Sequence, residues 1–393
     1  MRYFPPIVWQ LLIGMMFSRT ASFMTLPFLA IYMQNELQAP ALLIGLAVGI
    51  SPLTSTFGGF IGGFLTDKFG PKQILLISLV GWMMAFFGFA WSQSVWLFIV
   101  WNALNGLSRA FFEPSSQALM IAFTPQEKRR RLFSIRYMMI NFAAVIGPLV
   151  GVYIAQADMR LSPFTITAFI YIACLLFFAS VAKNPPTINE HAEKQTVRLL
   201  CHTIMSDRVL LSILLASVLA SFVYSQTDST LSQLLNMTMA DGIRLFSILI
   251  AVNAVTVVVL QLPLSIVSEK ISVYKSLLLG SAFTIIGMIL FAVADTMWLF
   301  ALAMFIISLG EIFIFPIIGV IIEMIAPEHA KASYLGALQF QNLGGFFGPI
   351  AGSWLLVHFI SSVYIVMALI GCVMLLCFIV SLRGKSVANS AHI

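Results

Sequence analysis

The stretch GFLTDKFGPK, residues 63–72, places three charged side chains and two glycines between two long apolar runs. The runs on either side, near 41–64 and 73–92, are each long enough to cross a bilayer, because a transmembrane helix needs roughly 20 predominantly apolar residues. The glycines permit a tight turn and a close approach of helices. The stretch therefore predicts a short charged loop between two membrane-spanning helices.

Apolar runs of this kind continue along the whole chain. Of its 393 residues, 60% are hydrophobic and 9% are charged, whereas a soluble domain is about 45–50% apolar and about 25% charged. This composition excludes a cytosolic enzyme, a nucleic-acid-binding protein and a disordered chain. We expect an all-α membrane protein with twelve spans, near 7–33, 41–64, 73–92, 95–122, 133–156, 163–182, 208–235, 245–268, 275–293, 297–324, 333–357 and 361–382.

The basic residues indicate how the spans are oriented. Sixteen of the 21 lysines and arginines fall in loops and tails on the side that holds both termini, and only Arg160 and Arg244 fall on the other side. By the positive-inside rule, both termini are therefore expected in the cytoplasm. On that side, we expect the basic run 128–131 to set the topology and contact anionic lipid. Arg136 is expected to snorkel, and Glu323 to lie at a gate or rim.

The two halves of the chain repeat at a displacement of about 202 residues. The matching segments are DK at 67–68 and EK at 269–270, FEP at 112–114 and IFP at 314–316, and IGPLVG at 146–151 and FGPIAG at 347–352. The repeat predicts two bundles of six helices, residues 1–182 and 208–383, joined by a cytoplasmic linker, 183–207, and followed by a tail, 384–393. Two such bundles related by an axis along the membrane normal are a known transporter architecture.

The stretch 63–72 resembles the loop motif G-x-L-x-D-[RK]-x-G-[RK]-[RK] of the major facilitator superfamily, which lies between the second and third spans. The residues that match it are Gly63, Asp67, Lys68, Gly70 and Lys72, and Pro71 replaces one of its bases. The resemblance implies the twelve-helix fold of that family, and a gate on the cytoplasmic rim formed by the matching residues. It also implies secondary transport by alternating access.

A segment of the fifth span resembles a second family motif. Ala143-x-x-x-Gly147-Pro148-x-x-Gly151-Val152 is similar to the antiporter motif G-x-x-x-G-P-x-x-G-G, from which it departs at Ala143 and Val152. Small residues allow close helix packing, and a proline bends a span, so a packing kink explains the same residues. The resemblance implies the twelve-span drug:proton antiporter type, which exports drugs, dipeptides or sugars from bacteria.

Five ionisable residues lie in the interior of four predicted spans, away from the span ends. Each costs at least about 2.5–3.5 kcal/mol at the centre of a membrane helix, so it is expected to face a cavity or a partner. Arg19 lies in the first span, Arg109 and Glu113 in the fourth, Asp228 in the seventh and Glu311 in the tenth. In the superfamily these four spans line the central cavity. Arg109 and Glu113 are four residues apart, which predicts an ion pair on one helix face.

Three of these residues are candidate proton carriers. Glu311 is the first choice, because it lies halfway along an otherwise apolar span, where desolvation favours the protonated carboxyl. Asp228 follows a polar patch and is a candidate for cation binding or an outer gate. Glu113, which is expected to be held ionised by Arg109, is the runner-up as proton site. The alternative for all of them is a structural salt bridge, in which Arg19 or Arg109 pairs with Glu311 or Asp228 of the other half.

These observations predict a transporter rather than an enzyme. The sequence shows no phosphate-binding loop, no nucleophile–base pair and no metal-like cluster of histidines or cysteines, so we expect no cofactor and no metal. The expected function is proton-coupled export of small amphipathic compounds by a monomer in a bacterial inner membrane. The partners would be the small-molecule substrate, protons and lipid, without nucleic acid. The alternatives are export or proton-coupled import of a defined metabolite (sugar, dipeptide or siderophore-like), and a non-transporting sensor.

Overall fold

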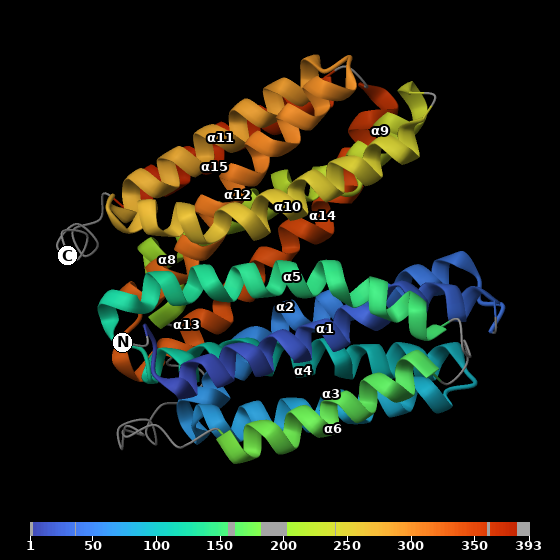
Figure 1. The fold of residues 1–393 in the computed structure, drawn as a ribbon, viewed down its shortest axis with the longest axis vertical. Helices are drawn as coiled ribbons and strands as arrows, with labels where there is room; N and C mark the ends of the chain where they lie inside the picture. Colours follow the sequence, from blue (N-terminus) through green and yellow to red (C-terminus); the bar gives the residue numbers. More distant parts are fainter. Residues whose placement is uncertain are drawn as a thin grey trace. The chain divides into compact units, whose positions relative to one another are not determined.

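The computed structural model describes residues 3–35, 37–155, 162–181, 203–239, 241–359 and 362–382, and every regular element in these ranges is a helix. Most of the expected linker and the whole tail lie outside the described residues. The first half contains α1 (Pro6–Asn35), α2 (Ala41–Phe69), α3 (Pro71–Trp91), α4 (Val95–Ala122), the 3₁₀ turn η1 (Gln126–Lys128), α5 (Arg129–Ala155) and α6 (Ser162–Val181), as Figure 1 shows.

The second half has more breaks than the sequence predicts. It contains α8 (Arg208–Tyr224), η3 (Ser225–Thr227), α9 (Thr230–Thr238), α10 (Gly242–Glu269), α11 (Val273–Val293), α12 (Met297–Ile325), η4 (Glu328–Ala330), α13 (Lys331–Ala337), η5 (Leu338–Gln341), α14 (Asn342–His358) and α15 (Val363–Leu382). In the described part of the chain, eleven helical segments are long and apolar enough to cross a membrane. The expected span 333–357 is divided by η5, which leaves α14 with 17 residues.

Two residues of the stretch 63–72 determine the turn between α2 and α3. α2 ends at Phe69, and Gly70 has a φ of 90°, a conformation that favours glycine. Pro71 then occupies the first turn of α3, where its fixed φ fits and its missing N–H costs no hydrogen bond. One glycine and one proline thus stop α2 and start α3 without an intervening loop.

Contacts divide the described residues into two units that differ from the two halves of the sequence. Unit 1 contains those within 1–127, 139–201 and 326–339, and unit 2 contains those within 128–138, 202–325 and 340–393. The start of α5 therefore packs in unit 2, and α13 packs in unit 1. These two pieces, 128–138 and α13, are the exchanged segments, because each packs with the other half of the sequence. Dividing the sequence at the linker could not predict this, because both segments are short and lie inside their own halves.

Unit 1 is held together by aromatic and polar contacts among α2, α3, α4 and α6. The buried rings of Trp82 and Tyr171 stack with centroids 5.0 Å apart, and Trp82 Nε1 donates to Asn105 Oδ1 at 2.9 Å. Asn105 in turn donates to Asn102 Oδ1, and Asn102 donates to the Ala47 carbonyl at 2.6 Å. These bonds satisfy polar groups that would otherwise be costly to bury.

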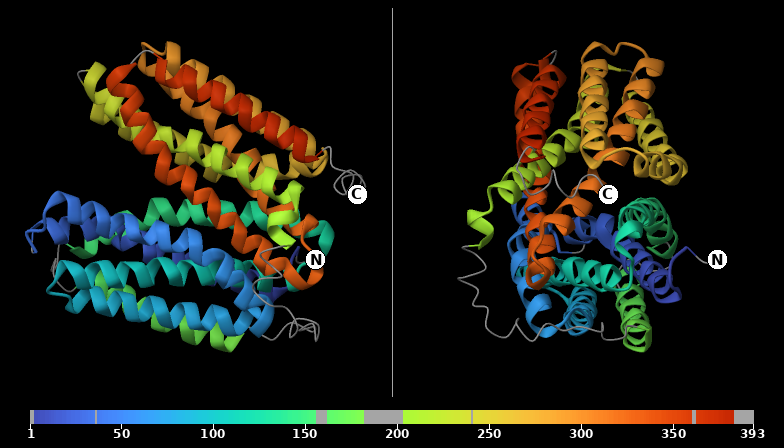
Figure 2. Two further views of the ribbon diagram at one scale, coloured as in Figure 1. Left: turned by 180° about the vertical axis from the view of Figure 1, so that it is seen from behind. Right: turned by 90° about the vertical axis from the view of Figure 1, so that its left-hand side faces the viewer.

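Unit 2 packs α11 against α12 and α15, α8 against α14 and α15, and α10 against α12. The orange and red helices α11, α12 and α15 of this unit run side by side (Figures 1 and 2). On α14, the glycines at 344, 348 and 352 face α8 and η3, where any Cβ would meet backbone or polar side-chain atoms. Close helix packing in unit 2 thus depends on small residues.

The repeat is visible in how the glycine–proline helices pack within each unit. A Cβ on Gly147 of α5 would lie 2.9 Å from the Thr20 carbonyl oxygen and 2.6 Å from Phe23 Cβ of α1. A Cβ on Gly348 of α14 would lie 2.8 Å from the Phe222 carbonyl oxygen and close to Ser225 Oγ. Thr20 and Phe23 precede Phe222 and Ser225 by 202 residues, so the same packing occurs in both units.

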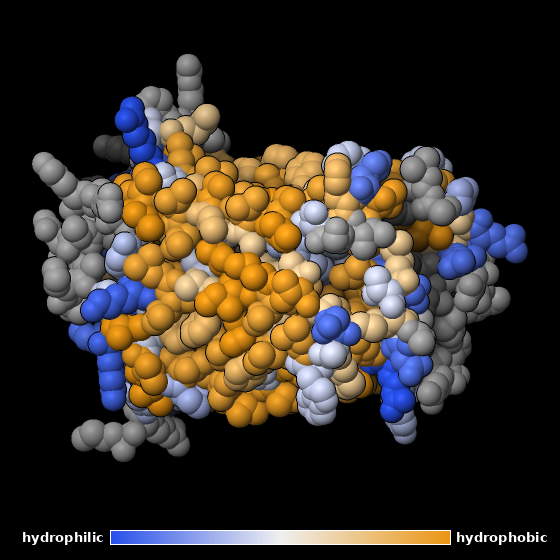
Figure 3. Space-filling model, turned by 90° about the horizontal axis from the view of Figure 1, so that it is seen from above, coloured by the Kyte–Doolittle hydropathy of each residue, from blue (hydrophilic) through white to orange (hydrophobic). Residues whose placement is uncertain are grey.

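The surface is typical of a protein that faces lipid. The face drawn in Figure 3 is mostly hydrophobic. Large apolar side chains such as Trp298, Tyr153 and Trp91 are strongly exposed. Exposed tryptophans near helix ends are typical of the membrane–water interface.

Candidate functional site

The Asp67 carboxylate of the first motif binds the start of α13. Its Oδ1 accepts from the Ala332 N–H at 2.9 Å, and its Oδ2 accepts from the Ser333 N–H at 2.7 Å and the Ser333 hydroxyl at 2.6 Å. The first N–H groups of a helix have no partner inside it, so an acceptor placed here satisfies them. All these residues lie in unit 1.

Two glycines of α2 let the backbone of α13 come this close. A Cβ on Gly63 would lie 2.7 Å from both the Ala332 carbonyl carbon and Ser333 Cα. A Cβ on Gly59 would lie 2.6 Å from the Gly336 carbonyl oxygen. The two bases of the motif lie elsewhere. Lys68 Nζ lies 5.3 Å from the Phe69 ring centroid, and Lys72 is half-buried near the start of α3.

The basic run that we expected at a lipid surface instead binds protein groups of unit 2. Arg129 pairs with Glu323, and Arg131 forms a bidentate pair with Glu269, in which Nε donates at 2.8 Å. Arg130 donates to the Ile271 carbonyl at 2.8 Å. The sequence showed only the run of positive charge, because its acceptors lie more than 130 residues further along the chain.

The two exchanged segments are held by pairs that the repeat relates. Asp67 and Ser333 in unit 1 lie 202 residues from Glu269 and Arg131 in unit 2, respectively. In each unit, an acid at the end of a helix, α2 or α10, therefore holds a segment that arrives from the other half of the sequence. The chemistry differs, because one acid binds backbone N–H groups and the other binds a guanidinium.

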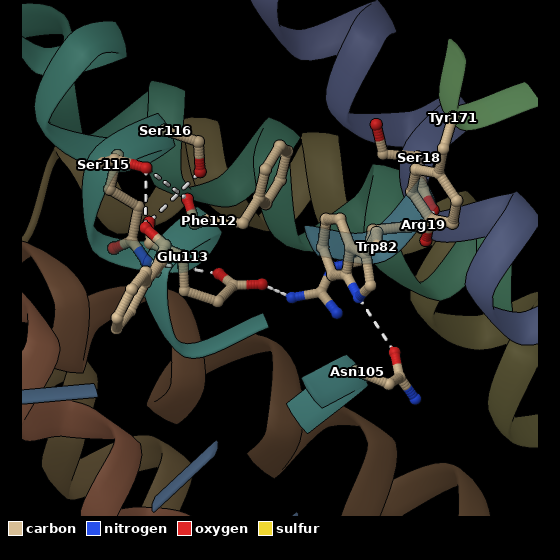
Figure 4. Close-up of polar contacts among 11 residues, drawn as sticks. Ser18, Arg19, Trp82, Asn105, Phe112, Glu113, Ser115, Ser116 and Tyr171 are labelled. Atoms are coloured by element: carbon tan, nitrogen blue, oxygen red, sulfur yellow. Dashed lines mark hydrogen bonds and ion pairs between the residues drawn. The ribbon is translucent and has the colours of Figure 1, made fainter. Parts of the chain in front are cut away.

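Inside unit 1, Glu113 forms an ion pair with Arg19 (Figure 4). Both residues are only 4% exposed, and Gln117 Nε2 lies 3.4 Å from Glu113 Oε2. The sequence predicted Arg109 of the same helix as a partner of Glu113 and did not predict Arg19. Spacing along one helix reveals only local partners, whereas Arg19 comes from α1. Arg109 is half-buried on α4.

Inside unit 2, the Glu311 carboxylate is held by neutral groups. It is 2% exposed. Its Oε1 accepts from the Tyr137 hydroxyl at 2.8 Å, and its Oε2 accepts from Asn253 Nδ2 at 2.8 Å. The Tyr224 hydroxyl is a further hydrogen-bonding neighbour. The Phe315 ring, one turn along α12, stacks on Tyr137 at 5.8 Å and meets Tyr224 edge-on at 5.6 Å.

Asp228 lies where the expected continuous span 208–235 is broken. α8 ends at Tyr224, the 3₁₀ turn η3 follows, and Asp228 is exposed in the turn before α9. The hydroxyls of Ser225 and Thr227 bond to carbonyls of the preceding turn at 2.8 Å, which competes with helical hydrogen bonding. Discontinuous membrane helices frequently form substrate and ion sites. Asp228 also interacts electrostatically with Glu311.

Comparison with known proteins decides the family. The family model described as Major Facilitator Superfamily matches residues 11–249 and 242–392. The chain belongs to the major facilitator superfamily. An uncharacterized MFS-type transporter, YqjV of Bacillus subtilis (strain 168), is 33% identical over 351 residues, which cover 88% of this chain and 85% of that protein. This confirms the family expected from residues 63–72, and with it a multi-pass membrane transporter rather than an enzyme.

More distant superfamily members have names that specify a function. A Na(+), Li(+), K(+)/H(+) antiporter of Planococcus maritimus is 26% identical over 377 residues (86% of this chain, 87% of the relative). The multidrug resistance protein MdtH of Yersinia pestis (strain Pestoides F) is 27% identical over 338 residues (85% and 82%). The crystal structure of the human organic anion transporter MFSD10 has a TM-score of 0.76 at 16% identity, covering 95% of this chain and all of that one. It confirms the all-helical superfamily fold.

The sequence did not single out Tyr137 and Asn253, two polar residues that donate to Glu311. Tyr137 was hidden in a span already marked by Arg136 and by the motif at Gly147. Asn253 was the clearer signal, because a carboxamide inside the apolar run 245–268 needs a partner. In the described residues, no group of three or more His, Cys, Asp or Glu side chains is placed to hold a metal ion.

Proposed function

We propose that this protein exports small amphipathic compounds from bacteria in exchange for protons. It works in the inner membrane with both termini in the cytoplasm, and its two bundles alternate access to a substrate cavity. Glu311 carries the proton. The single observation that carries the proposal is that the buried Glu311 carboxylate accepts hydrogen bonds from the neutral groups of Tyr137 and Asn253.

The surroundings of the two buried glutamates favour different protonation behaviour. Glu113 is paired with a guanidinium, and protonating it would remove the negative charge from this buried ion pair. Glu311 accepts from a phenol and a carboxamide, so it can gain a proton without stranding a cation. A proton carrier must change its charge during the cycle, and Glu311 meets this requirement better.

The groups beside Glu311 support an amphipathic substrate. The half-buried rings of Tyr137, Tyr224 and Phe315 surround the carboxylate, and Asp228 adds an exposed acid. Aromatic faces and carboxylates together attract organic cations. MdtH, at 27% identity, is a multidrug resistance protein. A protonated Glu311 holds such a cation less tightly, so uptake of a proton from outside favours release of the substrate there.

The exchanged segments support a gate on the cytoplasmic side. Asp67 holds α13, and Glu269 holds the start of α5, so each segment must leave its binding site when that side opens. We infer that these two acids stabilise the conformation closed to the cytoplasm. Gly63, Gly70, Lys68 and Lys72 complete the gate. The segment that holds Gly147, Pro148 and Gly151 packs against α1 at Gly147.

The test is proton flux in energised everted vesicles that contain the full chain. Adding compounds from a panel of amphipathic cations should release protons, and Glu311→Gln should abolish this release. Asp295→Asn, which alters an exposed acid outside these contacts, is the matched control and should respond like the unaltered protein. Full proton-coupled transport by both Glu311→Gln and Asp228→Asn would contradict the proposal.

The panel also separates the other candidate functions. Sugars and dipeptides test for a defined metabolite, and Na⁺, Li⁺ and K⁺ test for the activity named for the Planococcus maritimus relative. A response confined to one of these classes would replace multidrug export with that transport. No response to any class by correctly folded protein would favour a non-transporting sensor.

A further inference from the structure

Helix α5 is shared between the two units, and Tyr137 lies where it passes from one to the other. Residues 128–138 pack in unit 2, and α5 continues from Met139 in unit 1. Arginines 129–131 anchor the start of this segment to α10, α11 and α12. Tyr137 anchors its far end, within the membrane span.

Tyr137 contacts α12 in two ways. Its hydroxyl donates to Glu311 Oε1 at 2.8 Å, and its ring stacks on Phe315 with an interplanar angle of 6°. Glu311 and Phe315 are one helical turn apart, so they form one face of α12. The hydroxyl therefore holds the carboxylate, while the stacked ring fixes the position of the hydroxyl.

The hydrogen bonds show which carboxylate oxygen can take the proton. Oε2 accepts from the Asn253 amide nitrogen, which has no lone pair to accept from a protonated carboxyl. Oε1 faces the Tyr137 hydroxyl, which can donate to an ionised carboxylate and accept from a protonated one. The present arrangement, with a donor on each oxygen, matches the ionised form. A proton on Oε1 reverses the bond to Tyr137, whereas Asn253 cannot accept from a proton on Oε2.

We propose that Tyr137 is the positioning residue that transmits the protonation of Glu311 to α5. This inference rests on the proposed role of Glu311 as proton carrier. The bond to the ionised carboxylate holds the 128–138 segment of α5 on α12. A neutral carboxyl holds it more weakly, because hydrogen bonds to charged groups are the stronger ones. Proton uptake thereby loosens the segment of α5 that must leave α12 when the cytoplasmic gate opens.

Other groups around Glu311 do not offer the same link. Tyr224 of α8 and Asp228 of the following turn are its titratable neighbours on the other elements, and α10 contributes the neutral Asn253. α11 approaches the adjacent Gly310 through the neutral Thr284. Arg136 precedes Tyr137 on α5 and is half-buried. Among these, Tyr224 offers a matched control, since its hydroxyl also neighbours Glu311 but its helix is not exchanged.

The experiment measures hydrogen exchange of the full chain in nanodiscs, followed by mass spectrometry. The exchange rate of peptides within 129–138 is divided by that of peptides from α3, which cancels the chemical effect of pH. Glu311→Gln, which makes this hydrogen bond neutral, should raise the ratio about tenfold, the difference expected between a charge-assisted and a neutral hydrogen bond, and Tyr137→Phe, which removes the bond, should raise it at least as much. The double variant should raise it no further than Tyr137→Phe alone, because both changes act on the same bond. Tyr224→Phe should leave it unchanged.

Three outcomes overturn the inference: an unchanged ratio in Tyr137→Phe, an equal rise in Tyr224→Phe, or additive rises in the double variant. The proposed function fails separately. If Glu311→Gln raises the ratio as expected but retains proton-coupled transport, the link to α5 stands and the proton carrier lies elsewhere. If Glu311→Gln abolishes coupling while Tyr137→Phe leaves the ratio unchanged, Glu311 remains the carrier and Tyr137 has no part in transmission.

Discussion

Units 1 and 2 each bury a glutamate on a long helix, α4 or α12, but they neutralise it differently. Glu113 pairs with Arg19, whereas Glu311 accepts hydrogen bonds from Tyr137 and Asn253. A buried ion pair is stable only while both charges remain, whereas a carboxyl among neutral donors can exist in two protonation states. The comparison teaches that burial alone does not identify a proton carrier, and that the charge of its partner decides.

The largest expected effect comes from breaking the pair in unit 1. Arg19→Ala leaves the Glu113 carboxylate buried without its guanidinium and should destabilise the protein by about 3–5 kcal/mol. Thermal unfolding in detergent, followed by size-exclusion chromatography, measures the loss. A second change, Glu113→Gln, should restore part of the stability. A single variant as stable as the unaltered protein would show that the pair is not the main support of Glu113.

The contacts made by the two gate acids that the repeat relates, Asp67 and Glu269, should contribute differently to stability. Asp67→Asn replaces a carboxylate that accepts three hydrogen bonds, and its new NH₂ group would face N–H donors, so we expect a loss of about 2 kcal/mol or more. Arg131→Gln breaks a partly exposed pair with Glu269 and should cost about 1 kcal/mol or less. Hydrogen exchange of α13 and of the start of α5, respectively, measures each loss. Equal effects would mean that the chemistry of the two pairs does not matter.

Gly147 and Gly348, each followed by a proline inside its helix, should be equally sensitive to substitution by alanine. Gly147→Ala and Gly348→Ala each place a Cβ within 3 Å of backbone or side-chain atoms of α1 or α8, and overpacking of this kind costs about 1–3 kcal/mol. The midpoint of thermal unfolding gives the comparison. If only one of the two substitutions is destabilising, the packing at these two glycines is not equivalent in the two units.

The smallest effect on stability is expected where the functional effect is largest. Glu311→Gln leaves no buried charge unpaired and keeps an acceptor for Tyr137, so it should change the unfolding free energy by less than about 1.5 kcal/mol. The same thermal assay serves as the measurement. A loss as large as that of Arg19→Ala would indicate that Glu311 has a structural cation partner, as Glu113 has.

The sequence by itself determined the family, the helical membrane architecture and the internal repeat. These follow from local properties: a span is recognised from roughly 20 apolar residues, and the loop at Gly63–Lys72 from its own residues. It also identified Arg19, Glu113 and Glu311 as unusual, because a charge inside an apolar run is visible without any partner. The breaks at η3 and η5 were missed, because hydrophobicity continues through both.

Only the tertiary structure decided which groups meet. It joined Glu113 to Arg19 of another helix, gave Arg129 and Arg131 acidic partners, and placed Tyr137 on Glu311. None of these contacts follows from spacing, because each partner lies on another helix and often in the other half of the chain. Burial and hydrogen bonding are properties of the packed fold, and they show which groups neutralise each of the two glutamates.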